Sequence, residues 1–180
     1  MKILVASDIH GSATAACKIV GAAEAYGCDR IVLLGDLYYH GPRNRLPDGY
    51  APMQVAQTLN SVKHKLLVVQ GNCDSEVDAM VSEFAFFPSA ELVLGDGKVV
   101  LCTHGHVYNG ECLPPFGGYD ILLHGHTHVS GVWNRDGVIV INPGSTTLPK
   151  GGTPCSYCVL TEHSVTHYTI DGEKYSTVEF

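Results

Sequence analysis

Short apolar runs rich in β-branched residues recur along the chain, and a small polar cluster follows each of them directly. The apolar runs span residues 3–6, 31–34, 66–69, 99–102, 121–123 and 138–141. The polar clusters are Asp8-Ile9-His10, Gly35-Asp36, Gly71-Asn72-Cys73-Asp74, His104-Gly105-His106, Gly125-His126-Thr127-His128 and Asn142-Pro143-Gly144-Ser145. Runs of this length and composition are typical of buried strands. A chain that places Asp, His and Asn after successive strands is expected to build one site from several segments.

The first half of the chain alternates strand and helix signals. Ser12 is a plausible N-cap for a helix that Gly27 ends. A second helix is predicted from about Pro52. Its expected inner face consists of Met53, Val55, Ala56, Leu59 and Val62. This alternation favours parallel pairing of the strands through right-handed crossovers.

A third strand and helix complete the first half, since the apolar residues Val77, Met80, Val81 and Phe84 follow the strand at 66–69. The second half of the chain reads differently. Glycine-containing turns at residues 95–97 and 135–137 then predict two hairpins. Residues 156–180 are typical of a closing antiparallel meander. No linker or repeat interrupts the chain, so we expect a single domain spanning residues 1–180.

Composition narrows the possible partners. The chain has 180 residues, 45% of them hydrophobic and 16% charged, which fits a compact globular protein. Its net charge of −7 and the lack of a basic stripe argue against binding to extended nucleic acid. Seven scattered cysteines are typical of a reducing compartment. The apolar run at residues 3–6 is too short for a signal peptide or a membrane span, so we expect a cytoplasmic protein without membrane association.

The polar clusters have the composition of a site for two divalent metal ions. If the backbone were extended, Asp8 and His10 would point to one side, and so would His126 and His128. Asp36 stands alone and could bridge two ions through its two oxygens. The seven candidate ligands are Asp8, His10, Asp36, Asn72, His104, His126 and His128. Mixed oxygen and nitrogen ligands of this kind suit Mn, Fe, Co or Zn better than Ca.

The positive charge of two such ions would outweigh the two carboxylates and attract an anion. Two metals about 3.5–4 Å apart can hold a bridging hydroxide and clamp a phosphoryl oxygen during an in-line displacement. The polar clusters therefore predict chemistry at a phosphate group.

The ordered motifs from Asp8 to His128 resemble those of the calcineurin-like metallophosphoesterase superfamily, and in particular its bacterial branch of YfcE-like phosphodiesterases. The resemblance implies an α/β fold, a four-layer α/β/β/α sandwich of two mixed sheets flanked by helices. It implies one metal held by Asp8, His10, Asp36 and His128, and another held by Asp36, Asn72, His104 and His126. Mn²⁺ is the usual ion of this branch, with Fe, Ni, Co or Zn as alternatives. The implied activity is hydrolysis of a small organic phosphodiester by a metal-bridging hydroxide, in a homo-oligomer that we expect to be a dimer or tetramer.

Cys73 departs from the superfamily pattern, which usually has a histidine there to protonate the leaving group. A thiol with an ordinary pKa of about 8.5 fits that role less well than an imidazole. We therefore hypothesise weak acid catalysis, with His106 or His40 as substitute donors. Together with Asn72 and Cys73, these two histidines complete the candidate catalytic residues.

Other functions and roles remain open at this point. The same site could serve a phosphomonoesterase, and the fold could serve as a non-catalytic, Vps29-like protein-interaction scaffold. Arg43 could orient a phosphate or pair with a surface carboxylate. The favoured roles of the remaining motifs are structural: Asp74 as a helix cap, His124 as an interior residue, His64, His163 and His167 as surface or strand histidines, Cys155 and Cys158 as the start of a strand, and Asn142 to Ser145 as a turn that supports the site.

Overall fold

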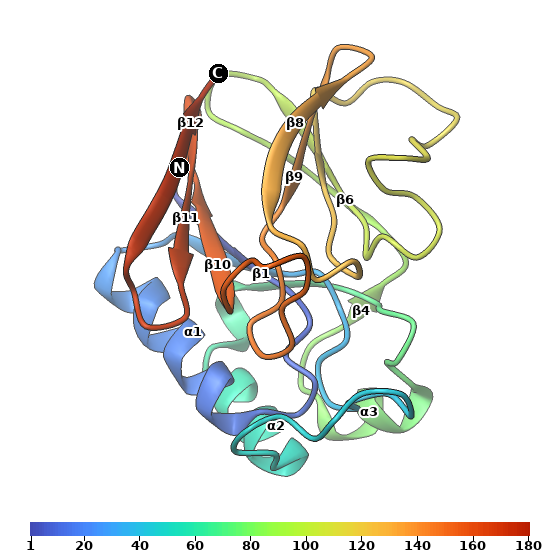
Figure 1. The fold of residues 1–180 in the computed structure, drawn as a ribbon, viewed down its shortest axis with the longest axis vertical. Coiled ribbons are helices and arrows are strands. Elements are labelled where there is room, and N and C mark those ends of the chain that lie inside the picture. The colour runs from blue at the N-terminus through green and yellow to red at the C-terminus, as the bar shows by residue number, and fades with distance from the viewer.

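The structure, a computed structural model, describes residues 1–180 and contains two mixed β-sheets with helices against one of them (Figure 1). The elements in chain order are β1 Ile3–Ala6, α1 Ala13–Ala25, β2 Arg30–Leu33, α2 Pro52–Ser61, the 3₁₀ helix η1 Lys63–Lys65, β3 Leu66–Val69, α3 Glu76–Val81, β4 Phe86–Phe87, β5 Ala90–Val93, β6 Val99–Cys102, β7 Ile121–Leu123, β8 Gly131–Arg135, β9 Val138–Asn142, β10 Ser156–Leu160, β11 Ser164–Thr169 and β12 Lys174–Glu179. None of the helices is both long and apolar enough to cross a bilayer.

The seven-stranded sheet has the order β12-β11-β10-β1-β2-β3-β4, and the five-stranded sheet has the order β5-β6-β7-β9-β8. Neighbours from β1 to β4 run parallel, as do β6, β7 and β9. The predicted hairpins are confirmed as β5–β6 and β8–β9, and the closing meander is confirmed as β10–β11–β12. Parallel pairing brings the carboxyl ends of several strands to one edge of each sheet.

Successive side chains of a strand point to opposite faces of its sheet, so the central strand β1 contributes to two separate hydrophobic cores. Ile3 and Val5 of β1 belong to the core between the sheets, where they meet Ile121 and Leu123 of β7. Leu4 of β1 faces the opposite way, into the core formed with α1 and α2. The chain thus fills both faces of its central strand without a disulfide.

The predicted α/β sandwich of two mixed sheets flanked by helices is confirmed. Figure 1 shows α1 and α2 against the seven-stranded sheet, on the far side from β6, β8 and β9. The outer face of the five-stranded sheet packs instead against Leu113 and Tyr119, which lie in the segment 103–120 without helix or strand. A loop layer covers that sheet.

The helix limits agree with the sequence, but one predicted inward residue faces solvent. Ser12 caps α1, and Gly27 follows its end at φ +63°. Met53 is 57% exposed, so the prediction that it belongs to the inner face of α2 was wrong. In α3, Val77 is 66% exposed and Met80 83%. The helix α3 has only six residues, none of them buried. Its last residue, Val81, and Phe84 beyond it are partly buried against the core that faces α1 and α2.

Candidate metal centre

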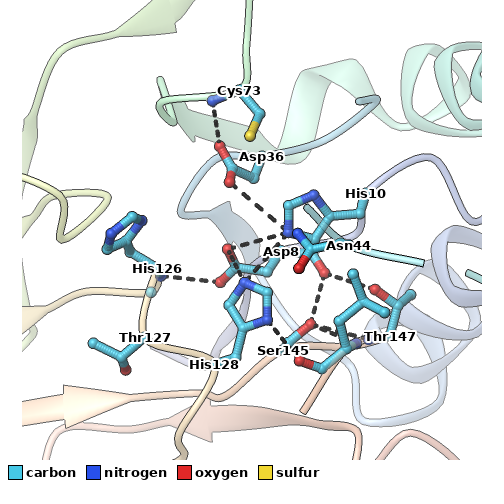
Figure 2. Close-up of polar contacts among 12 residues, drawn as sticks. Asp8, His10, Asp36, Asn44, Cys73, His126, Thr127, His128, Ser145 and Thr147 are labelled. Carbon is cyan, nitrogen blue, oxygen red and sulfur yellow. Dashed lines mark hydrogen bonds and ion pairs between the residues drawn. The ribbon is translucent and has the colours of Figure 1, made fainter. Parts of the chain in front are cut away.

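All seven candidate ligands lie at the edge where the two sheets meet, each in a loop that follows a strand. Asp8 and His10 follow β1, Asp36 follows β2, and Asn72 follows β3 of the seven-stranded sheet. His104 follows β6, and the pair His126 and His128 follows β7 of the five-stranded sheet. Figure 2 shows Asp8 lying among His10, His126 and His128. The structure therefore brings together residues that are far apart in the chain.

The backbone that carries these ligands is left-handed rather than extended. Asp8, His10, Asp36, His126 and His128 have φ values of 56°, 49°, 56°, 66° and 61°. Only one further non-glycine residue, Asp136, has a positive φ. The convergence of Asp8 with His10 was predicted, but the extended geometry offered as its reason was wrong. Such conformations cost roughly 1–3 kcal/mol each and persist where the surrounding structure enforces them, which is typical of functional sites.

A close approach of two loops brings Asp36 beside Asn72. Gly35 has φ +96°, and a Cβ there would lie 2.4 Å from the backbone nitrogen of Gly71. Only glycine leaves room for this contact. The amide of Cys73 donates to Asp36 Oδ1 at 2.8 Å across the same junction.

Asp8, His10 and His128 form one group of potential ligand atoms. Asp8 Oδ1 lies 3.3 Å from His128 Nε2 and 3.7 Å from His10 Nε2. The two imidazole Nε2 atoms are 3.3 Å apart. All three side chains are almost completely buried. This group offers one carboxylate and two imidazoles at a single point.

Asp36, Asn72, His104 and His126 form the second group. His104 Nε2 lies 3.5 Å from Asp36 Oδ1, 3.0 Å from Asn72 Oδ1 and 3.2 Å from His126 Nδ1. The other oxygen of Asp36 lies 3.8 Å from His10 Nε2. Asp36 therefore directs one oxygen to each group, which is the arrangement that a bridging carboxylate needs.

Backbone carbonyls orient three of the four imidazoles. The Nδ1–H groups of His10, His104 and His128 donate to the carbonyl oxygens of Tyr39, Leu34 and Leu148 at 2.7, 2.6 and 2.6 Å. With the proton on Nδ1, the lone pair of each neutral ring is on Nε2, and all three Nε2 atoms point into the site. Metal-binding histidines in proteins are usually held in this way.

The residues present fit divalent cations. Asp8 Oδ1 is buried and has no hydrogen-bond partner, which is costly unless something positive compensates it. Neutral imidazoles that face each other at 3.3 Å would oppose their lone pairs, and a cation between them removes this repulsion. The side chains in question carry carboxylate, amide and imidazole donors. Such a set suits Mn, Fe, Co or Zn.

The electrostatics of the site favour the deprotonated forms of Asp8 and His126 but the protonated form of His128. Burial would raise the pKa of Asp8, but His128, His104 and His10 outweigh burial and hold that pKa far below its usual range. Burial lowers the pKa of His126, and the neighbouring His104 lowers it further. Burial also opposes protonation of His128, but the Asp8 carboxylate raises the pKa of that imidazole overall. Metal binding would displace that proton, so affinity should fall in acid.

Hydroxyl groups from a distant turn hold the backbone of Asp8. Ser145 Oγ and Thr147 Oγ1 donate to the Asp8 carbonyl oxygen at 2.9 and 3.0 Å. The turn at residues 142–145 therefore supports the site, as predicted. Asn142 Nδ2 extends this support to the other sheet by donating to the carbonyl oxygen of Gly125 at 3.1 Å.

Asp74 holds the loops after β2 and β3 together. Its carboxylate accepts backbone N–H groups from Asp36 at 2.8 Å, Leu37 at 2.8 Å and Gly71 at 2.7 Å. Burial raises its pKa to about 6, although these three donors lower it. Ser75, in a capping box with Asp78, is the N-cap of α3. The prediction that Asp74 is a helix cap was therefore wrong, because the buried backbone amides around Asp36 take its oxygens.

The candidate proton donors lie at different distances from the ligands. Cys73 forms a group with His10 and Asp36, and burial followed by the Asp36 carboxylate raises its pKa to about 12. The His106 ring lies 5.4 Å from the His104 ring, and burial and His104 lower its pKa. His40 packs edge-on against Tyr39 and Tyr50 and does not line the cavity at the metal ligands. Of the three, only Cys73 lines the cavity at the metal ligands. His106 packs beside the His104 and His126 rings, and His40 packs against tyrosines.

A cavity of about 410 Å³ opens onto the ligands and carries two cationic side chains. Asp36, Asn72, His126 and His128 line it, together with Arg43 and Lys150. Arg43 is exposed, and the only arginine in an ion pair is Arg135, so Arg43 does not pair with a surface carboxylate. Both cations are free to meet an anion. Lys150 was not among the candidate site residues; it lies in the stretch from Leu148 to Gly152, after the turn that supports the site.

The remaining histidines and cysteines have structural positions. His124 is buried behind the site and packs edge-on against Trp133, as predicted for an interior residue. His167 is a strand residue of β11, but it is buried, and it donates to the Asn142 carbonyl oxygen at 2.9 Å. His64 and His163 are exposed. All seven cysteines are free, and Cys155 directly precedes β10.

Comparisons of this chain with a family model, with related proteins and with solved structures all point to phosphoesterases. A model of the calcineurin-like phosphoesterase superfamily domain matches residues 1–164. The phosphodiesterase YfcE of Escherichia coli K12 is 45% identical over 160 residues, which cover 89% of this chain and 87% of that protein. A solved structure of the E. coli phosphoesterase YfcE has a TM-score of 0.93 and 40% identity, covering 99% of both chains. Vacuolar protein sorting 29 of Cryptosporidium parvum, with 19% identity and a TM-score of 0.66 over 99% of this chain and 97% of that one, shares the fold alone.

Proposed function

Since this chain belongs to the calcineurin-like phosphoesterase superfamily, we propose that it is a phosphodiesterase that hydrolyses small organic phosphodiesters at a dinuclear metal centre. Phosphoester hydrolysis and the use of divalent metal follow from the family. The proposal adds the preference for diesters, the number of ions and the ligands. Its support comes from the name and 45% identity of the E. coli relative and from the site geometry.

One observation carries the proposal: Asp36 directs its two oxygens to two different groups of potential ligands. Asp8, His10, Asp36 and His128 would hold one ion. Asp36, Asn72, His104 and His126 would hold the other. When bound, two such ions lower the pKa of water to generate the attacking hydroxide, and they polarise the phosphoryl oxygens.

The residues around the ligands would bind and orient the substrate. Arg43 and Lys150 line the cavity over the ligands and would attract the phosphate anion, whose single negative charge in a diester they can balance. Arg43 offers a planar fork of donors, whereas Lys150 offers a point charge. Asn72 lies between this cavity and the His104 ring, and its amide would approach the phosphate closely.

The leaving group would receive little help from a proton donor. A thiol whose pKa is near 12 releases its proton poorly at neutral pH, so Cys73 is a weak general acid. His106 lies within the aromatic cluster of His104 and His126 and is the better placed substitute. The enzyme would therefore prefer esters with good leaving groups, such as aryl esters.

A metal-reconstitution assay tests the proposal. Protein stripped by a chelator is reloaded with Mn²⁺, Fe²⁺, Co²⁺, Ni²⁺ or Zn²⁺ in turn, and p-nitrophenol release from bis(p-nitrophenyl) phosphate is compared with release from the monoester. We expect no turnover in the stripped protein, highest turnover with Mn²⁺, and faster hydrolysis of the diester. Faster hydrolysis of the monoester would make the protein a phosphomonoesterase, and no turnover with any ion would favour a Vps29-like scaffold.

A further inference from the structure

A second cavity adjoins the candidate metal centre, and the function proposed above does not use it. Its volume is about 540 Å³, and its lining includes Asn72 and His104. Asn72 also lines the smaller cavity that contains Asp36, Arg43 and Lys150. The two cavities therefore meet at Asn72, the one candidate metal ligand that lines both.

The two cavities differ in chemistry. The larger one has no lysine or arginine in its lining, and its walls include Leu101, Val107, Tyr108 and Phe116. Its one carboxylate, Asp74, is fully occupied by backbone N–H groups. The smaller cavity suits an anionic phosphate, whereas the larger one suits an uncharged group attached to that phosphate.

Two large apolar side chains on the wall of the larger cavity remain exposed. Val107 is 56% exposed and Phe116 is 49% exposed, and both belong to the loop layer 103–120. The ring centroids of Phe116 and Tyr119 lie 6.2 Å apart in a T-shaped pair, and Phe116 is the member that lines the cavity. A ligand that covers these side chains removes apolar surface from water. A rigid aromatic ring does so with a smaller loss of its own conformational entropy than a flexible chain.

We propose that the larger cavity binds one ester group of the substrate and that this group is an uncharged aromatic ring system. The inference rests on the proposed phosphodiesterase function and names its substrate class: phosphodiesters with at least one aromatic ester group. The phosphate lies at Asn72, and the ring extends past His104 and His106 toward Phe116. A volume of 540 Å³ falls in the range of roughly 300–1,000 Å³ typical of small-molecule sites.

Binding of two simple phosphonates separates ring recognition from phosphate recognition. Phenylphosphonate and methylphosphonate are titrated by calorimetry into the Mn²⁺-loaded protein, which requires no turnover. We expect phenylphosphonate to bind about tenfold more tightly, a difference of ~1.4 kcal/mol. Phe116→Ala should remove most of this preference while changing methylphosphonate binding less than about twofold. Val107→Asn, at an exposed position outside the cores, should act in the same direction.

Met53→Ala is the matched control, because Met53 is comparably exposed at 57% but lies on α2, away from the cavity. It should leave both affinities unchanged. Equal affinity of the wild-type protein for the two phosphonates, or a preference that survives both Phe116→Ala and Val107→Asn, overturns the inference. A preference for phenylphosphonate in a protein that hydrolyses no diester would uphold the ring site and reject the proposed activity instead.

Discussion

The loops of the seven-stranded sheet and those of the five-stranded sheet contribute different chemistry to the candidate metal centre. The first set supplies both carboxylates, Asp8 and Asp36, with His10 and the Asn72 amide. The second set supplies imidazoles alone, from His104, His126 and His128. The carboxylates that would attract cations therefore lie on one sheet, while three of the four imidazoles that would share those cations lie on the other.

This division means that neither sheet has a complete site by itself. The polar contacts that align the site also cross between the sheets. His104 Nδ1 donates to the Leu34 carbonyl oxygen at 2.6 Å, and the His126 amide donates to Asp8 Oδ2 at 3.0 Å. Metal binding and the packing of the two sheets should therefore be coupled in free energy. The following predictions test this coupling, starting with the largest expected effect.

Asp36→Asn removes the one carboxylate that contacts both groups of ligands. We expect kcat/KM for bis(p-nitrophenyl) phosphate to fall by about 10³-fold or more, a loss of several kcal/mol of metal-derived stabilisation. Asp136→Asn is the matched control, because Asp136 has a similar φ of 52° but lies exposed in the β8–β9 turn. Comparable activity of the two variants would contradict a bridging role for Asp36.

Removal of metal should loosen the packing between the sheets. Ions at about 100 times their Kd stabilise a protein by about 2.7 kcal/mol. For a chain of this size that corresponds to a Tm difference of about 5–10 °C between Mn²⁺-loaded and chelated protein. Differential scanning calorimetry measures the shift, and Asp36→Asn should reduce it. An unchanged Tm after chelation would mean that the sheets pack independently of the ions.

The sequence predicted the strands and the ligands better than it predicted the geometry that joins them. Runs of buried β-branched residues identified the strands, and polar residues after them identified Asp8, Asp36 and His104. The left-handed backbone at Asp8 and His10 has no such signal, since φ above zero is uncommon outside glycine. It arises from tertiary contacts such as the bonds from Ser145 and Thr147 to the Asp8 carbonyl oxygen.

Hydrogen bonds between site side chains and backbone groups also could not be predicted from sequence patterns. The carbonyl oxygens of Tyr39, Leu34 and Leu148 orient three imidazoles, but any residue type offers a carbonyl. The backbone N–H groups that donate to the Asp74 carboxylate also leave no signal in the sequence, because every residue except proline has one. The helix start beside Asp74 suggested a cap instead. The apolar residues Val77 and Met80 predicted a helix, and α3 forms there, but both side chains are exposed.

Cys73→His places an imidazole in a loop of the seven-stranded sheet. We expect turnover of alkyl phosphate esters to rise by about tenfold, below the roughly 10²–10⁴-fold that a well-positioned general acid contributes, while turnover of aryl esters stays unchanged. The physical reason is that an alkoxide leaving group needs a proton and a nitrophenolate does not. Parallel assays with one alkyl and one aryl ester measure the effect. An unchanged rate for both esters would contradict the claim that the thiol at position 73 limits protonation of the leaving group.

His167→Gln alters a contact between the sheets, the hydrogen bond to the Asn142 carbonyl oxygen, that involves none of the candidate ligands. Burial lowers the pKa of His167 despite its hydrogen bond to Asn142, so the folded state binds fewer protons than the unfolded chain below about pH 6.5. The contribution of neutral His167 to the free energy of unfolding is complete above about pH 6.5. It is lost as the pH falls from there through the lower pKa of His167 in the folded state. In metal-free protein, His167→Gln should flatten this dependence by at most about 1.4 kcal/mol per pH unit. Urea unfolding from pH 7 to pH 5 measures the slope.

His163→Gln is the control for that substitution, because His163 is exposed in the turn before β11. The account predicts that His163→Gln keeps the slope of the wild-type protein. An identical slope in His167→Gln would contradict the assignment of this pH dependence to His167.

The most direct test of the dinuclear centre is the number of Mn²⁺ ions bound per chain, measured by equilibrium dialysis and elemental analysis. The account predicts two ions in the wild-type protein and in Asp136→Asn, and fewer in Asp36→Asn, because Asp36 alone directs an oxygen to each group of ligands. A wild-type protein that binds one ion or none, or an Asp36→Asn variant that keeps both, would contradict it.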